Sequence, residues 1–339
     1  MQVIKVIESG PFTTVQDGGR FGYQRYGMAP AGAMDEVSYQ LGNLILGNEA
    51  NAASLEFTLK GPRLEILHDT ALVVTGGRCV VNVNGHRKYL IFEPIEVKSG
   101  DQVDIEWITE GVRGYLAVKG GFDVPLIMQS RSTYLRGKIG GFEGRRLKGE
   151  EVLSAFQSNN SLGRALPEKQ WPSYLPPFEI DVIMGPQVDF FTEEGINTFL
   201  NETFQISESA DRMGYRLTGP EVVHVDKADI ISDGIPLGAI QVPGHKQPII
   251  MMKDRQTTGG YPKIATAVSY EIYRLGQAKP GDQLSFRSVS LDQAIEKKNH
   301  YNKWFQGLTE YVSQPAQGEK HFRLFIDDKS YYVSIKEID

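Results

Sequence analysis

Short runs in which apolar and polar residues alternate recur along the whole chain. Residues 64–67 (LEIL) and 102–106 (QVDIE) are two examples, and glycine or proline residues separate such runs. Alternation with a period of two is typical of a strand with one buried face, and Gly and Pro mark turns. The pattern therefore predicts a mainly β fold of many short strands.

A hairpin and a few helices can be placed within this pattern. Asn84 and Gly85 form an Asn-Gly pair between two β-rich runs, which is a strong hairpin signal. Helical periodicity is confined to about residues 33–47, 189–201 and 291–312.

A weak internal echo divides the chain. Residues 98–103 (KSGDQV) return as 279–284 (KPGDQL), and residues 59–62 (LKGP) are matched by 217–220 (LTGP). In both copies the Gly-Asp turn leads into a strand-like run. Two copies of one β-barrel-like unit would produce this echo, and so would coincidence.

The boundary between the two units is predicted in a polar, proline-rich stretch, which is typical of a linker. The predicted organisation is a first β-barrel lobe at 1–153, the linker at 154–177, a second β-barrel lobe at 178–289, and a helix–hairpin appendage at 290–339.

The appendage combines an amphipathic helix that carries Trp304 and Phe305 with a hairpin whose strands are residues 322–326 and 331–335. A lone two-stranded hairpin is only marginally stable in water. We therefore expect the appendage to dock onto a lobe or onto a neighbouring protein, and to contribute nothing to chemistry. Packing on its own lobe alone is the other possibility.

Composition and charge narrow the class of protein. The chain has 339 residues, 40% of them hydrophobic, and a net charge of −6 without a basic stripe. Nucleic acid and anionic membranes are therefore not expected partners. No segment approaches the roughly 18–20 apolar residues of a membrane span, and residues 1–8 lack the apolar core of a signal peptide. We expect a cytoplasmic protein.

Several common chemistries lack their signatures. There is no P-loop, dinucleotide-binding glycine motif, nucleophile elbow or His-Glu-x-x-His motif, and the six histidines are scattered, so no metal site is expected. The single cysteine, Cys79, lies in a β-branched run at 73–81 that is typical of a buried strand. We expect a packed thiol rather than a nucleophile, because reactive thiolates need exposed, electropositive settings.

Polar, glycine-rich loops are the remaining candidates for chemistry. In the first half they are residues 13–23, with Asp17 and Arg20, and residues 129–133, with Arg131. An ordinary Asp-Gly-Gly turn is the alternative for the first of these.

The second half carries the strongest candidate loop. Residues 238–243 contain Gln241, and residues 253–265 contain Asp254, Arg255, Gln256, Thr257, Thr258 and Lys263. Arg255 offers a planar fork for a carboxylate or phosphate, and Lys263 supplies a point charge. The loop is therefore suited to holding an anion, with a solvated turn closed by an Asp254–Arg255 pair as the alternative.

Four segments carry a family resemblance: residues 14–22 (TVQDGGRFG), 113–122 (RGYLAVKGGF), 211–217 (DRMGYRL) and 254–265. With them the chain closely resembles the biotin-dependent carboxyltransferase/allophanate hydrolase subunit 2 family. This family is also known as the Kip-antagonist family, and its bacterial members include the C subunit of 5-oxoprolinase. The resemblance runs from about residue 10 to 286. Gln129 stands where the family usually has glycine, and residues 291–339 lie outside the pattern.

The resemblance implies a fold, partners and an activity. It implies two cyclophilin-like β-barrel lobes, a partner like the B subunit of 5-oxoprolinase, which is of the allophanate hydrolase subunit 1 family, and a third protein like the A subunit of 5-oxoprolinase. It further implies the ATP-dependent opening of 5-oxoproline to glutamate, with ATP used by the complex and not tightly bound.

On this hypothesis the charged loops form one shared anion-binding cleft. The residues expected in catalysis are Arg255, Lys263 and Asp254, and those expected to bind substrate or anion are Asp17, Arg20, Arg131, Arg212, Gln241, Gln256, Thr257 and Thr258.

Two other functions are compatible with the sequence. The chain could be a non-catalytic antagonist that binds a regulator resembling a histidine-kinase inhibitor. It could also be a carboxyltransferase half-site that works with a separately encoded biotin carrier on urea or a related amide. If Lys263→Ala loses 5-oxoproline turnover but still binds its partner proteins, the chain is an enzyme subunit. If the activity is sensitive to avidin, the carboxyltransferase is favoured.

Overall fold

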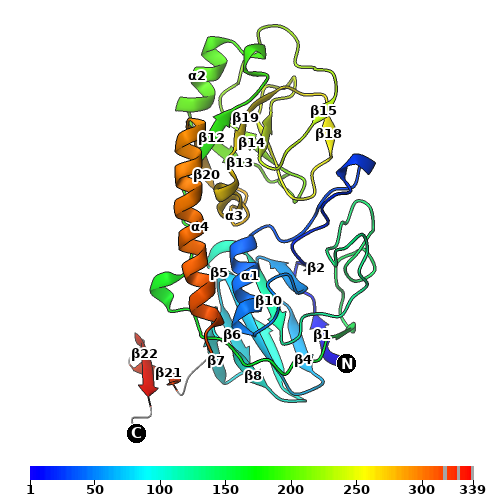
Figure 1. Cartoon of the computed structure of the whole chain (residues 1–339), viewed down its shortest axis with the longest axis vertical. Coiled ribbons are helices and arrows are strands. Elements are labelled where there is room, and N and C mark those ends of the chain that lie inside the picture. Colours follow the sequence, from blue (N-terminus) through cyan, green and yellow to red (C-terminus); the bar gives the residue numbers. More distant parts are fainter. Residues whose placement is uncertain (316–318, 327–328, 337–339) are drawn as a thin grey trace.

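The computed structural model describes residues 1–315, 319–326 and 329–336, the last two segments without their side chains. It confirms a mainly β chain with few helices and a C-terminal helix (Figure 1). Two large hydrophobic cores fill two lobes, one built mostly from residues before 167 and the other from residues after 177. The exact domain boundaries remain predictions.

The first lobe consists of two sheets. The six-stranded sheet has the order β11 (Val152–Ser154), β1 (Gln2–Glu8), β4 (Arg63–Ile66), β9 (Gln102–Ile105), β6 (Val80–Val83), β7 (Arg87–Leu90). The five-stranded sheet has the order β2 (Phe12–Gln16), β3 (Ser54–Thr58), β10 (Glu110–Val118), β5 (Thr70–Arg78), β8 (Ile95–Val97).

The second lobe is a closed seven-stranded barrel. Its order is β12 (Phe178–Met184), β19 (Lys263–Ala267), β16 (Ala239–Gln241), β17 (Ile249–Met251), β14 (Gly214–Thr218), β13 (Phe204–Ile206), β20 (Gln283–Ser288). A two-residue ladder of β15 (Asp233–Gly234) and β18 (Thr258–Gly259) lies outside the barrel ladder. A barrel was expected in both lobes; the structure closes one in the second lobe and forms two sheets in the first.

The predicted helices are present. They are α1 (Glu36–Ile45), α2 (Glu193–Asn201) and α4 (Leu291–Ser313), and a four-residue helix, α3 (Ile272–Leu275), was not predicted. The start of α1 is fixed by Asp35, whose side chain accepts a hydrogen bond from the Ser38 backbone. The start of α4 is fixed by a capping box of Ser290 and Gln293.

The hairpin predicted at Asn84-Gly85 is confirmed. Strands β6 and β7 pair antiparallel across it, and both turn residues have positive φ, 56° for Asn84 and 72° for Gly85. Two central residues with positive φ define the turn type that suits the twist of a hairpin.

The echoed turns have the same hydrogen bonds in both lobes. The Asp101 backbone donates to Lys98 and its carboxylate accepts from the Lys98 backbone; Asp282 and Lys279 repeat both contacts. The turn glycines have φ of 89° and 90°. The repeated sequence therefore forms the same turn twice, each time before a strand, β9 or β20.

The C-terminal helix α4 packs along both lobes of its own chain (Figure 1). Leu308 and Val312 join the core of the first lobe, and Ala294 packs with Val268 and Tyr270 of the second. Trp304 remains 37% exposed. The backbone of the predicted hairpin is present as β21 (Glu319–Ile326) and β22 (Lys329–Lys336), while its turn and side chains lie outside the described residues.

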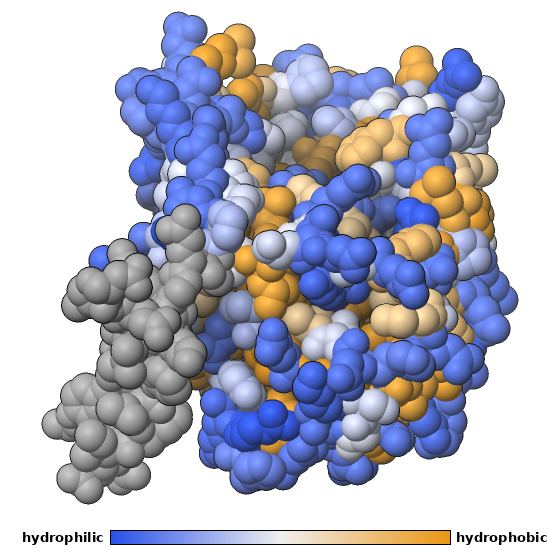
Figure 2. All heavy atoms as spheres, turned by 60° about the horizontal axis from the view of Figure 1, so that its bottom comes forward, coloured by the Kyte–Doolittle hydropathy of each residue, from blue (hydrophilic) through white to orange (hydrophobic). Residues whose placement is uncertain are grey.

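No helix among the described residues is long and apolar enough to cross a membrane. On the face shown in Figure 2, hydrophilic residues cover most of the surface and hydrophobic residues form smaller groups. Cys79 is buried, as expected, and burial raises the pKa of its thiol to about 12.

Candidate functional site

Arg255 is a buried cation with no carboxylate partner in the described part of the chain. Arg255 lies in the loop that follows β17, and it is only 6% exposed. Nε donates to the Ile235 carbonyl at 2.9 Å and Nη1 to the Met252 carbonyl at 3.3 Å, and no ion pair reaches it within the described residues. Burial lowers the pKa of Arg255 to about 10. The alternative of a local pair with Asp254 does not occur, because Asp254 pairs elsewhere.

Arg255 lines a pocket of about 340 Å³ to which both lobes contribute residues. The first lobe contributes Gln24 and Pro30, and the second contributes the β15 region and residues 255–257. An unpaired buried cation that lines a pocket favours an anionic ligand, because a bound carboxylate or phosphate compensates a charge that the fold leaves uncompensated.

Lys263 lies at the start of β19 and already has a counter-ion. Its Nζ donates to Asp233 at 2.8 Å; Lys263 is buried, whereas the Asp233 side chain is 55% exposed. The hydrogen bond from Lys263 holds the pKa of Asp233 below its ordinary value. Asp233 was not predicted from the sequence. Its partner Lys263 is 30 positions away, and the Ser-Asp-Gly sequence around Asp233 indicates only a turn.

The amides of Gln241 and Gln256 meet at Gly259. A Cβ atom built on Gly259 would lie 3.1 Å from Nε2 of each. Gln241 also donates to the Tyr261 carbonyl at 3.1 Å. Thr257 lines the Arg255 pocket, and Thr258 is exposed on β18. Most of the predicted second-lobe residues are thus gathered around one loop.

Asp254 and Arg212 pair with each other at the junction of the lobes. Arg212 donates from Nε and Nη2 to the Asp254 carboxylate at 3.1 and 3.0 Å, and from Nη2 to the Gly32 carbonyl at 2.7 Å. Nη1 donates to Glu56 on β3. Burial opposes the charge, yet the carboxylates of Asp254 and Glu56 raise the pKa of Arg212. Arg212 therefore joins the two lobes, and Asp254 holds it from within the second lobe.

Glu56 was not singled out from the sequence. It lies between Leu55 and Phe57 in β3 and is 1% exposed. The sequence did carry a signal for Glu56, because it is an acidic residue between apolar neighbours in a strand with both faces buried. A buried carboxylate needs a partner, so such a residue indicates a buried polar contact. Here Arg212, the Tyr115 hydroxyl and the Met34 backbone donate hydrogen bonds to it, and Arg113 forms a longer ion pair with it at 3.9 Å.

In the first lobe, Asp17 organises the loop that carries Arg131. Its carboxylate accepts hydrogen bonds from the Ser130 and Ser132 hydroxyls at 2.7 and 2.5 Å and from the Arg131 backbone at 2.5 Å. Arg20 is fully buried beside it and donates to the Ser132 carbonyl, while its Nε and Nη1 have no partner among the described residues. Burial lowers the pKa of Arg20.

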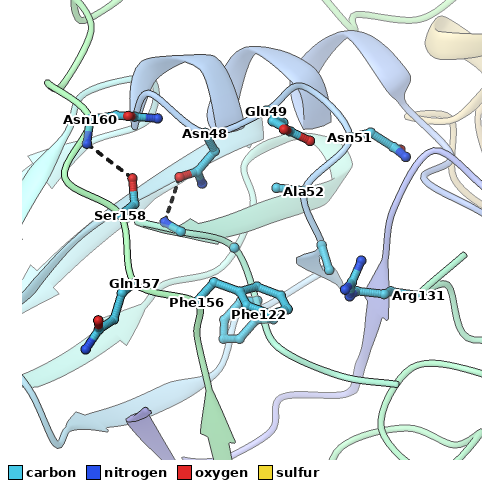
Figure 3. Close-up of a pocket in the computed structure, with 13 residues that line it drawn as sticks. Asn48, Glu49, Asn51, Ala52, Phe122, Arg131, Phe156, Gln157, Ser158 and Asn160 are labelled. Carbon is cyan, nitrogen blue, oxygen red and sulfur yellow. Dashed lines mark hydrogen bonds between the residues drawn. The ribbon is translucent and has the colours of Figure 1, made fainter. Parts of the chain in front are cut away.

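Arg131 lines a different pocket from Arg255. This pocket, of about 370 Å³, lies in the first lobe and shares no lining residue with the Arg255 pocket (Figure 3). The structure therefore does not gather the predicted residues into one cleft. Arg255, Gln256 and Thr257 share a pocket, Arg131 lines another, and the roles of all of them remain predictions. Within the described residues, no cluster of His, Cys, Asp or Glu could hold a metal ion.

Comparison with known proteins places this architecture in a family. Residues 26–288 match the family described as carboxyltransferase domain, subdomain A and B, and the chain belongs to this family. It is 35% identical to the C subunit of 5-oxoprolinase from Escherichia coli over 90% of this chain and 97% of that protein. It is also 35% identical to urea amidolyase of Lachancea kluyveri, over 87% of this chain but 17% of that protein.

A solved structure agrees with these relationships. The urea amidolyase of K. lactis superimposes with a TM-score of 0.84 at 31% identity, over 99% of this chain and 22% of that chain. The chain therefore spans less than a quarter of the urea amidolyases it matches, and nearly the whole of the E. coli protein.

Proposed function

We propose that this chain is one component of an ATP-dependent 5-oxoprolinase complex that opens 5-oxoproline to glutamate. Its partners in this proposal are a protein like the B subunit of 5-oxoprolinase and one like the A subunit. The similarity to the C subunit of 5-oxoprolinase, over nearly the full length of that protein, supports it. ATP is a substrate of the complex rather than a tightly bound cofactor.

The observation that carries the proposal is Arg255, a buried cation that lines a pocket between the lobes and has no ion-pair partner among residues the structure describes. 5-Oxoproline bears a carboxylate, and in the proposed reaction the γ-phosphoryl group of ATP is transferred to the lactam oxygen with release of ADP, which adds negative charge to the substrate. Arg255 can offer its fork to either anion. Lys263 follows the same loop as the first residue of β19, and an anionic ligand that reached it would compete with the half-exposed Asp233 for its ammonium group.

The test is reconstitution of the complex from this chain and the two partner proteins. We expect phosphate release from ATP that depends on 5-oxoproline, with glutamate formed in equal amount. Each of the three proteins assayed alone serves as the control. The absence of 5-oxoproline-dependent turnover by the full set would overturn the proposal.

A carboxyltransferase half-site is the second candidate, favoured by the superposition of 99% of this chain, including the region of α4, on a urea amidolyase. In that case a biotin carrier must deliver the carboxyl group. Adding avidin to the reconstituted system separates the two functions: a 5-oxoprolinase keeps its rate, whereas a biotin-dependent carboxyltransferase loses it.

A further inference from the structure

The pocket beside Arg131 has opposite charges on two of its sides. Figure 3 shows Glu49 and Asn51 along one side, the Phe122 and Phe156 rings on the opposite side, and Arg131 at one end. Glu49 and Arg131 form no ion pair with each other or with any other described residue. The space between them is therefore open to a ligand that carries both charges.

Arg131 and Asn51 each use one polar group of the side chain and keep others without a partner among the described residues. Nε of Arg131 donates to the Val124 carbonyl at 3.1 Å, which leaves both terminal nitrogens without an acceptor among the described residues. The guanidinium carbon lies 5.1 Å from the centre of the Phe156 ring, so the ring covers one face and leaves the fork available. Asn51 uses its oxygen for the Gly18 backbone at 2.7 Å and keeps its amide hydrogens.

The walls of the pocket are held by three segments that the sequence analysis singled out. Asp17 fixes the Arg131 backbone, and Gly18 fixes the Asn51 side chain. The segment 113–122 contains Gly120 and Gly121, just before its last residue, and they have φ of 89° and 74°. A Cβ on Gly120 would lie 2.0 Å from the Phe156 carbonyl, so only glycine lets the Phe156 segment lie so close. The backbone around the pocket is thus fixed by the fold, while the side chains of Glu49, Asn51 and Phe156 are exposed at its rim.

From this arrangement we propose that the first lobe binds an α-amino acid in its zwitterionic form. The carboxylate lies against the Arg131 fork, the ammonium group faces Glu49, and the amide of Asn51 supplies a further donor. The Phe122 and Phe156 rings cover the aliphatic part. A simple carboxylate satisfies only Arg131, and a simple ammonium ion satisfies only Glu49. This site goes beyond the proposed function and does not rest on it.

Calorimetric titration of the full chain with L-alanine, L-glutamate, acetate and methylammonium tests the proposal. We expect both amino acids to bind more tightly than acetate or methylammonium. Arg131→Gln and Glu49→Gln should each weaken L-alanine at least about tenfold, because each removes one charge-assisted contact. Glu49→Gln should leave the weak acetate binding unchanged. Arg216→Gln, an exposed arginine on β14 of the other lobe, is the matched control.

Three results would overturn the proposal. One is no binding of either amino acid at millimolar concentration. Another is amino acid binding that survives both variants, which would locate it elsewhere. The third is acetate binding as tightly as L-alanine with no effect of Glu49→Gln, which would make the pocket a carboxylate site only. Arg131→Lys, which keeps the charge, distinguishes loss of the fork from a folding defect, because it should retain part of the affinity.

Discussion

Arg212 pairs with the carboxylates of both Asp254 and Glu56 at the lobe junction. Arg212→Ala leaves the buried carboxylate of Asp254 without its cation and leaves Glu56 with only the longer ion pair to Arg113, at 3.9 Å. We expect it to lower the free energy of unfolding by about 3–5 kcal/mol. Denaturant titration measures this loss. Lys98→Ala, which removes an exposed pair with Asp69, is the control and should leave the midpoint unchanged. Equal effects of the two variants would contradict an anchoring role for Arg212.

Cys79 should be chemically silent in the folded protein. Its thiol is buried, and its pKa is raised to about 12, so almost no thiolate forms near pH 8. We expect no labelling by a thiol-specific reagent at pH 8 in the native state and labelling of one thiol per chain after denaturation. Rapid labelling of the native protein would mean that β5 and β6 open around this residue.

At the residue scale the sequence predicted which loops are polar but not what each side chain contacts. Asp254 and Arg255 are adjacent, yet one faces Arg212 and the other lines a pocket. Their directions depend on the backbone between β17 and β18, which composition does not determine. Arg212 is 42 positions from Asp254 and 156 from Glu56, so no local sequence pattern predicts that these three residues pair.

At the scale of elements, α4 is tied to the barrel by a carboxylate. Asp181 on β12 is buried, which opposes its charge, but hydrogen bonds from Lys297 on α4, Tyr270 and Arg287 lower its pKa below 3.8. A lowered carboxylate pKa gives a contribution to stability that is complete above about pH 3.8 and is lost as the pH falls through the lower, folded-state value.

Amide exchange of residues 291–313 reports this contact. We expect their protection factors to fall below pH 3.8 in the wild-type protein more than those of β5 do. In Asp181→Asn, protection of α4 should already be lower at pH 6 and should change less on acidification. The same pH dependence in both proteins would show that Asp181 does not fasten the helix.

Removing residues 291–339 tests what the appendage does. The helix covers apolar surface of both lobes of its own chain, so we expect a lower melting temperature and an unchanged oligomeric mass. A smaller assembly would show an interface with another protein. Leu308→Ala gives a milder version, with an expected cost of about 2–5 kcal/mol for a buried leucine. Normal mass and stability without turnover would contradict a purely structural appendage.

Elements with strong local signals were predictable, and those fixed by distant contacts were not. The Asn-Gly hairpin and the capped helix α4 carry their signals in a few adjacent residues. The four-residue helix α3 is too short for periodicity to show. The sheet order of the first lobe depends on pairings such as β1 with β11, about 150 residues apart, which alternation alone does not specify.

At the scale of the whole molecule, both lobes contribute to the Arg255 pocket, and buried polar contacts hold the lobes together. Arg113 on β10 donates to the Tyr215 hydroxyl on β14 at 2.8 Å, and Gln277 donates to Asp35 at 2.8 Å. A change in the relative position of the lobes would therefore alter the pocket that Gln24 and Pro30 share with Arg255. The sequence echo predicted two units, but the pocket between them follows only from their packing.

The central claim is that Arg255 holds an anion in the reaction of a 5-oxoprolinase complex. The direct measurement is the 5-oxoproline-dependent rate of phosphate release by the reconstituted complex, with the wild-type chain and with Arg255→Ala, at equal complex mass. We predict turnover with the wild-type chain and a loss of roughly ten- to a hundredfold in kcat/KM for 5-oxoproline with the variant. If the wild-type complex turns over 5-oxoproline and the kcat/KM of the Arg255→Ala complex is within about threefold of the wild-type value, the claim is contradicted.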